Sequence, residues 1–214
     1  MNENKIIGML TGHSLASCME TLSLQDYTDL TDCTQIATKS ADMLCSRFVD
    51  SSTWLHEYVK TLEFLGWSVF EDAIFTRISR VISHSVADFL VQSAQGMQDP
   101  RQGNAMIDTL DALKPDKPAL VSLDEESLMG ERFQVIPARY DTKGFLEIAV
   151  FNLELVVRTK RSSFLFWNWE NQDAKIIQRR ASLKLDRYRL EHKRPLIDKK
   201  IHEIAMKRFN LQKR

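Results

Sequence analysis

The spacing of apolar residues changes once along this chain, and that change constrains the fold more than any single motif. Before Gly130 apolar residues recur at helical steps, as at Trp54, Tyr58 and Leu62. From residue 133 to 138 the pattern instead has a period of two, the spacing of a strand. The change predicts a helical region over residues 1–128 and a β-rich region over residues 129–214.

The first region is predicted to fold into several helices. Gly66 is placed to end one of them, and Ser68 with Glu71 forms a capping box that predicts a long helix starting there. A second capping box, Ser122 with Glu125, predicts a brief turn after a linker at residues 114–118. The predicted helices are 13–22, 27–48, 54–65, 68–95 and 105–113, and the buried face of the fourth would carry Ile74, Ile78, Ile82, Val86 and Leu90.

The second region predicts four strands with short connections, at residues 133–138, 145–157, 164–169 and 177–185. Short connections favour an antiparallel meander. Asp186 stands where a helix N-cap belongs, and a closing helix is expected to kink at Pro195. The predicted fold class is therefore α+β: an N-terminal helical region, a four-stranded antiparallel β-meander and a C-terminal helix, as two domains or one continuous fold.

Charge is distributed unevenly, although Lys+Arg and Asp+Glu both number 29. Residues 158–214 carry a formal charge of +11, and residues 1–157 carry −11. Such asymmetry indicates either two surfaces with different partners or two regions that attract each other. The hydrophobic share of 43% excludes a disordered chain.

Motifs with catalytic chemistry are weak. The segment Gly12–Ala16 resembles the strand–elbow–helix of α/β-hydrolases, in which a sharp turn exposes a nucleophile, here Ser14. Ala16 replaces the usual last glycine, and the alternating β/α units of that fold do not follow, so a cap on the first helix explains Ser14 more simply. The pairs beginning at His56 and His202 lack the second histidine of a zinc-protease motif.

Neither a phosphate-binding glycine loop nor a zinc ribbon is present in the sequence. Three adjacent acids, Asp124 to Glu126, are explained by a helix start. We therefore expect no catalytic site, cofactor or metal, with enzymatic activity left open. The three cysteines are expected in helices as free thiols, and the apolar patch at 6–10 is too short for a signal peptide. Both observations favour a cytoplasmic protein, and export without a signal peptide is left open.

The most unusual segment is Ser163–Trp169, which is apolar on both faces of its predicted strand. Aromatic residues beside basic ones suit an acidic protein, an anionic membrane or a nucleic acid, whereas core packing needs no partner at all. The candidate contact residues are Lys160, Arg161, Trp167, Trp169, Arg179, Arg180 and Lys184. Our main hypothesis is a non-enzymatic interaction protein that docks an acidic protein through a basic sheet-plus-helix surface. The alternatives are a membrane-active or toxin-like protein, and a nucleic-acid-binding protein.

Overall fold

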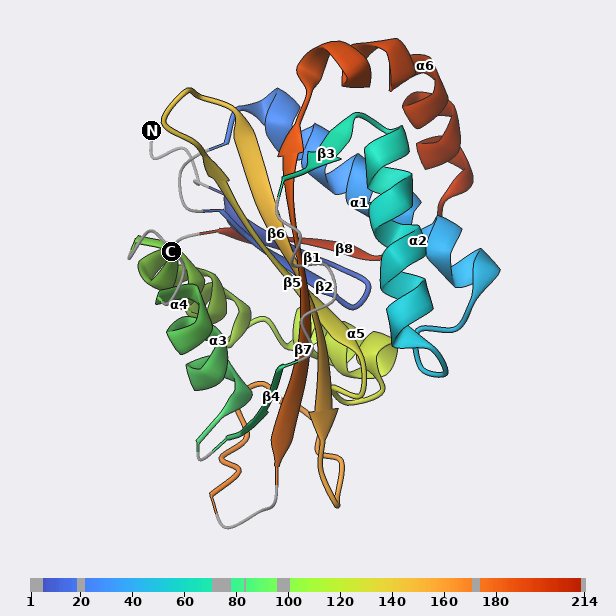
Figure 1. The fold of residues 1–214 in the computed structure, drawn as a ribbon. Helices are drawn as coiled ribbons and strands as arrows, with labels where there is room; N and C mark the ends of the chain where they lie inside the picture. Colours follow the sequence, from blue (N-terminus) through green and yellow to red (C-terminus); the bar gives the residue numbers. More distant parts are fainter. Residues whose placement is uncertain are drawn as a thin grey trace.

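One mixed sheet of eight strands runs through the centre of the computed structural model, with helices on both of its faces (Figure 1). The structure describes residues 6–18, 22–70, 78–82, 84–95, 101–170 and 174–212. The strand order is β3-β7-β6-β5-β2-β1-β8, and β4 also pairs with β7. The strands are β1 (Ile6–Thr11), β2 (Ser14–Cys18), β3 (Trp67–Val69), β4 (Ile78–Val81), β5 (Phe133–Tyr140), β6 (Leu146–Val156), β7 (Lys175–Leu185) and β8 (Arg208–Gln212).

The six helices of the described residues form two layers around this sheet. The first layer packs on one apolar core, which includes Trp54, Tyr58 and Trp67, and the second packs on another, which includes Phe133 and Trp169. The first layer consists of α1 (Leu24–Leu44), α2 (Ser51–Phe64) and α6 (Arg187–Glu203), and the second of α3 (Val86–Gln95), α4 (Arg101–Leu113) and α5 (Lys117–Ser127). Because helices cover both faces, inner strands bury side chains on both sides and lose a clear polar alternation.

The predicted four-stranded meander is therefore wrong, although the α+β class is broadly right. The hydrophobic run at residues 6–10 is strand β1, and residues 14–18, predicted as helix, form β2 in a hairpin with it. Strand β2 then pairs in parallel with β5, which no meander contains. Both early strands are almost wholly buried, so their sequences show no period of two.

The long helix predicted from Ser68 is also wrong within the described residues. Gly66 has φ +109° and a Cβ there would lie 2.7 Å from the Leu190 nitrogen, so the chain turns sharply after α2 and enters β3. Residues 78–81 form β4, while Glu71 and Ile74 lie outside the described residues. Among the described residues of the predicted span, only those of α3 are helical.

The segment predicted as the third strand, 164–169, is a run of turns. Its backbone bonds to the start of α3, because Ala87 N donates to Leu165 O and Trp169 N donates to His84 O. The second capping box is wrong as well, since α5 starts at Lys117 with Asp116 as its N-cap. The three acids at 124–126 accordingly lie near the end of a helix and not at its start.

The other predicted elements agree with the structure to within a few residues. These are helices α1, α2 and α4, strands β5 to β7, the turn at Gly144 and the N-cap Asp186 of α6. Helix α6 continues through Pro195 and bends between its halves (Figure 1). It ends at Glu203, and the chain returns as β8 beside β1. Strands from residues 6–81 and strands from residues 133–212 belong to the same sheet. The predicted division into two domains at residue 128 stays a prediction.

Candidate functional site

Exposed apolar side chains gather at one end of the sheet, where β6 ends and β7 begins. Nine of the fifteen large apolar side chains that are exposed in the described residues belong to segments that strand pairing and hydrogen bonds link to this end: the end of α1 with the α1–α2 connection, α5 with the turn after it, the ends of β4 and β6, and the segment 157–170. We call this set the apolar end: Met43, Leu44, Val49, Val81, Val121, Leu128, Met129, Val156 and Trp167. The segment from 157 to 170, drawn in orange, projects from this end beside α5 and β4 (Figure 1).

Hydrogen bonds tie the separate segments of the apolar end together. Arg47, in the α1–α2 connection, donates to the Glu126 carbonyl at 2.7 Å, and Arg132 donates to the Arg47 carbonyl at 3.0 Å. The carboxylate of Asp124 in α5 accepts from the Ser163 amide at 2.6 Å. Burial raises the pKa of Asp124, and hydrogen bonds from the backbone amides of Ser163 and Phe164 oppose that rise. Hydrogen bonds therefore link the α1–α2 connection, α5, the start of β5 and the segment 157–170.

Two residues of the apolar end, Leu128 and Met129, lie in a strained turn between α5 and β5. Leu128 has φ 52° and Met129 has φ 57°, a left-handed conformation that costs a non-glycine residue roughly 1–2 kcal/mol. Both side chains are nonetheless more than 40% exposed, so burial does not offset the strain. They line a hollow of about 340 Å³ together with Val121 and Lys160, and the acidic residues Asp124 and Glu125 also line it.

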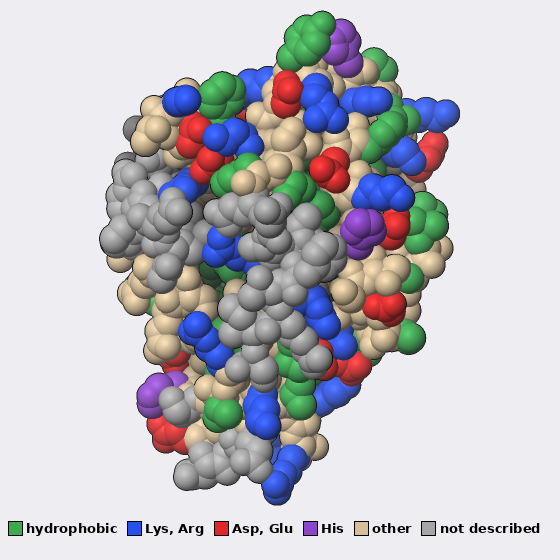
Figure 2. Space-filling view, in the orientation of Figure 1, with side chains coloured by type: hydrophobic (Ala, Val, Ile, Leu, Met, Phe, Trp, Pro, Cys, Tyr) green, Lys and Arg blue, Asp and Glu red, His purple; other side chains and the backbone are tan. Residues whose placement is uncertain are grey.

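Cations are interleaved with the apolar side chains at this end. The guanidinium of Arg161 lies 5.1 Å from the centroid of the Trp167 ring, and that of Arg47 lies 4.9 Å from the Phe48 ring. Lys160 forms an ion pair with Glu131. Figure 2 shows basic and apolar side chains side by side toward the lower end of this face. Because Arg47 is buried and pairs with Asp42, the exposed cations named here, Lys160 and Arg161, both belong to the segment 157–170.

The structure separates the seven residues predicted as a contact surface. Lys160, Arg161 and Trp167 lie together in the β6–β7 connection, and Trp167 is 39% exposed. Trp169 is completely buried, and its indole nitrogen donates to the Phe164 carbonyl at 3.3 Å. Trp169 therefore has no surface to offer a partner in this arrangement.

The three predicted contact residues on β7 lie away from this group and point to different faces of the sheet. Arg179 faces α2, where it donates to Ser51 Oγ at 2.8 Å. Arg180 and Lys184 point to the opposite face, since side chains alternate along a strand. Lys184 lies between Asp141 and Glu147, at 2.8 and 3.0 Å. Hydrogen bonding and ion pairing to Lys184 lower the pKa of Asp141 to about 2.

Much of the positive C-terminal charge meets the acidic region within the same molecule. Arg187 pairs with Asp26 at 2.7 Å, and Lys207 pairs with Glu125 at 3.6 Å. Burial alone would raise the pKa of Asp26, but hydrogen bonds from Tyr140, Arg187 and Ser23 hold it below its ordinary value. Attraction between the two regions therefore accounts for at least part of the charge asymmetry.

Sequence reasoning missed most of the apolar end. Met43 and Leu44 fall inside the predicted helix 27–48, whereas Val49, Leu128 and Met129 fall between predicted elements. The available signal was the placement of large apolar residues at predicted helix ends, where exposure is high.

Other candidate chemistries find little support in the described residues. Ser14, the residue of the hydrolase-like segment, lies in strand β2 and donates to Gln134 Oε1 at 2.9 Å, so neither the elbow nor the preferred helix cap is present there. Cys18 and Cys33 are buried free thiols, and burial raises the pKa of each to about 12. The described residues contain no group of three or more His, Cys, Asp or Glu arranged to hold a metal ion. Likewise, none of their helices is long and apolar enough to cross a membrane.

No family model and no curated protein matches this chain. Among solved structures, a delta-endotoxin shares 9% sequence identity at a TM-score of 0.44, covering 82% of this chain and 84% of its own. The activated Cyt2Ba monomer from Bacillus thuringiensis subsp. israelensis shares 14% at 0.43, covering 80% and 95%. The Evf virulence factor shares 9% at 0.42, covering 94% and 84%. At these scores the likenesses assign neither a family nor a function to this chain.

Proposed function

We propose that this chain is a membrane-active protein that docks its apolar end on anionic bilayer surfaces. The observation that carries the proposal is the concentration of exposed apolar side chains at the apolar end. Monomeric proteins seldom expose large apolar clusters, and such clusters mark interaction sites. Aromatic residues at headgroup depth, with cations near anionic lipid, are a recurrent arrangement at bilayer surfaces.

The distribution of charge favours a membrane over an acidic protein docked on the basic sheet. Lys184 already contacts two carboxylates, and Arg179 already contacts Ser51. Arg161, in contrast, stacks on the partly exposed Trp167. The segment 157–170 contains three cations and one carboxylate, and although Lys160 pairs with Glu131, the formal charge of the segment favours anionic lipid. Docking to an acidic protein or to nucleic acid stays a prediction, as does a cytoplasmic location.

Tryptophan fluorescence offers a direct test, because Trp54, Trp67 and Trp169 are completely buried and only Trp167 is partly exposed. We expect a blue shift of the emission on vesicles rich in phosphatidylserine, decreasing as salt is raised, and no shift on phosphatidylcholine vesicles. The shift should be absent in Trp167→Phe. An unshifted spectrum together with no co-sedimentation at low salt would contradict the proposal.

A matched pair of variants tests the location of the contact. The double variant Leu128→Asn/Met129→Asn removes apolar area from the apolar end, and we expect at least about a tenfold loss of vesicle affinity. Leu24→Asn is the control, because Leu24 is 80% exposed but lies outside the apolar end. Equal binding by the double variant and the control would show that another surface carries the interaction.

A further inference from the structure

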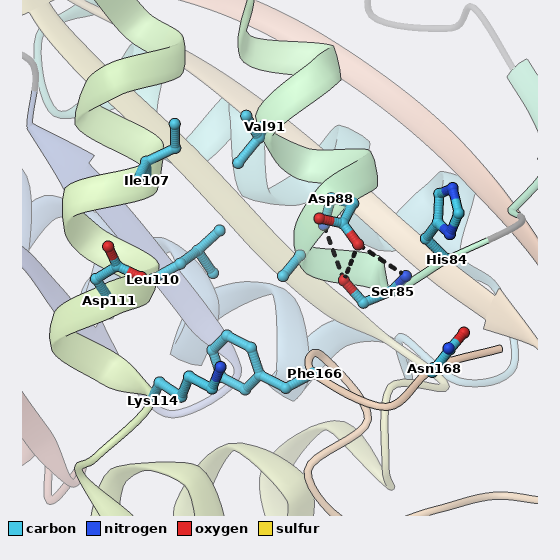
Figure 3. Close-up of a pocket in the computed structure, with 11 residues that line it drawn as sticks. His84, Ser85, Asp88, Val91, Ile107, Leu110, Asp111, Lys114, Phe166 and Asn168 are labelled. Atoms are coloured by element: carbon cyan, nitrogen blue, oxygen red, sulfur yellow. Dashed lines mark hydrogen bonds between the residues drawn. The ribbon is translucent and has the colours of Figure 1, made fainter.

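A cleft of about 420 Å³ lies between α3, α4 and the segment 163–170 (Figure 3). Its apolar lining includes Val91, Ile107, Leu110 and Phe166. Polar and charged side chains, among them Asp88, Asp111 and Lys114, make up the rest of the wall, and a volume of several hundred Å³ is in the range of small-molecule sites. None of the nine residues of the apolar end lines it, although Phe166 and Asn168 in its wall flank Trp167 in the chain.

One side of the cleft offers a cation. Lys114 follows the last residue of α4, and its Nζ lies 5.7 Å from the centroid of the Phe166 ring. Within the part of the chain that the structure describes, no carboxylate lies within 4.0 Å of this amine. Figure 3 shows the two side chains next to each other at the edge of the cleft. The ammonium group is therefore available to a carboxylate beside an aromatic wall.

The opposite side offers a carboxylate. One oxygen of Asp88 accepts from the Ser85 hydroxyl at 2.6 Å and from the Ser85 amide at 3.1 Å. The hydrogen bond from the Ser85 side chain is the main cause that lowers the pKa of Asp88, so the group is charged at neutral pH. Its second oxygen is turned toward α4 (Figure 3). His84, also at the cleft, is engaged by Glu170 at 3.1 Å.

We propose that this cleft binds a small zwitterion with an apolar body, of which an apolar α-amino acid is the simplest example. Its carboxylate would pair with Lys114, its ammonium group with Asp88, and its side chain would pack on Leu110 and Phe166. A simple anion would leave the carboxylate of Asp88 unmatched. A simple cation would meet Lys114. Phosphoethanolamine has both charges but no apolar body for the wall.

Isothermal titration calorimetry with three related probes tests the charge requirement. L-Phenylalanine keeps both charges, N-acetyl-L-phenylalanine keeps only the anion, and L-phenylalaninamide keeps only the cation. We expect L-phenylalanine to bind, and each derivative to bind at least about tenfold more weakly. Binding of one derivative as tightly as the amino acid would overturn the zwitterion assignment, and so would the absence of heat with both L-phenylalanine and L-leucine.

Variants then locate the site. Lys114→Gln and Asp88→Asn should each lose at least about tenfold in affinity for L-phenylalanine. Asparagine at position 88 keeps an oxygen that can accept the hydrogen bonds from Ser85, so Asp88→Asn retains the start of α3. Lys117→Gln and Glu63→Gln are controls outside the cleft and should bind like the parent chain. Circular dichroism checks that each variant is folded. Unchanged affinity in both cleft variants would refute the assignment, whatever the outcome of the vesicle experiments.

Discussion

The guanidinium of Arg194 in α6 donates to both carboxylate oxygens of Asp29 in α1, at 2.7 and 3.2 Å. The two residues are 165 positions apart, and Asp29 is buried while Arg194 is partly exposed. Arg187 and Asp26 form a second such pair, about two turns earlier in α6 and about one turn earlier in α1. A basic helix from the end of the chain is thus held against an acidic helix from its beginning.

Removing Arg194 should destabilise the fold, because it leaves the charge of Asp29 buried without its partner. For Arg194→Gln we expect a loss of about 1–2 kcal/mol, less than for a fully buried pair because Arg194 is partly in water. Urea unfolding measures the loss. In a double-mutant cycle, adding Asp29→Asn should recover part of it. If Arg194→Gln costs no more than Lys199→Gln at the exposed face of α6, the ion pair contributes nothing to stability.

His13 predicts a dependence of stability on pH. It is completely buried in the β1–β2 turn, 5.5 Å from the Trp54 ring, and burial together with the nearby charge of Arg47 lowers its pKa well below 6.5. Below pH 6.5 His13 therefore stays neutral in the folded chain but binds a proton in the unfolded chain. Its contribution to the free energy of unfolding is fully present above pH 6.5 and decreases as the pH falls below that value. Between pH 7 and 5.5 we expect a loss of about 1 kcal/mol from this group.

The phenylalanine variant isolates that contribution. His13→Phe keeps an aromatic ring beside Trp54 but cannot bind a proton, so its stability should change less over this range. His202→Phe, at an exposed position, should keep the full slope of the parent chain. Parallel pH profiles for the parent and His13→Phe would show that His13 does not titrate differently on folding.

The fold was predictable from sequence where one face of an element meets water. Trp54, Tyr58 and Leu62 form a clean stripe because the rest of α2 is solvated, and β5 to β7 were located within a few residues. Prediction failed for β1 and β2, which are buried on both sides and carry no alternation. It failed again at β3 and β4, which are three and four residues long. Such short strands depend on pairing with β7, a long-range contact that no local pattern reveals.

The candidate site was predicted only in part, for a related reason. Trp167 and Trp169 have the same parity and were expected on one face of a strand. Because the segment is a run of turns, residues two positions apart need not point to the same side. The indole of Trp167 is accordingly partly exposed, whereas that of Trp169 is completely buried. The remainder of the apolar end comes from segments far apart in sequence, which hydrogen bonds such as Arg47 to Glu126 bring together.

The two tryptophans should differ sharply in their effect on stability. Trp169→Phe removes part of a completely buried ring and its bond to Phe164, and we expect a loss of about 1–3 kcal/mol. Trp167→Phe should change stability by less than about 0.5 kcal/mol, because its ring is partly in water. Thermal or urea unfolding of both variants gives the comparison. Equal losses would mean that Trp167 is packed as deeply as Trp169.

The strained turn at Leu128 and Met129 links stability to the proposed contact. Asparagine tolerates the left-handed conformation better than leucine or methionine, and both native side chains are substantially exposed. Leu128→Asn/Met129→Asn should therefore keep stability or raise it by about 0.5–1 kcal/mol, measured by urea unfolding, while vesicle affinity decreases. Gly130→Ala is the opposite case, because its φ is +89° and a Cβ would lie 2.6 Å from the Phe164 ring; it should destabilise the turn. A double variant that loses stability would show that the exposed leucine and methionine support the fold and are not retained for contact with a partner.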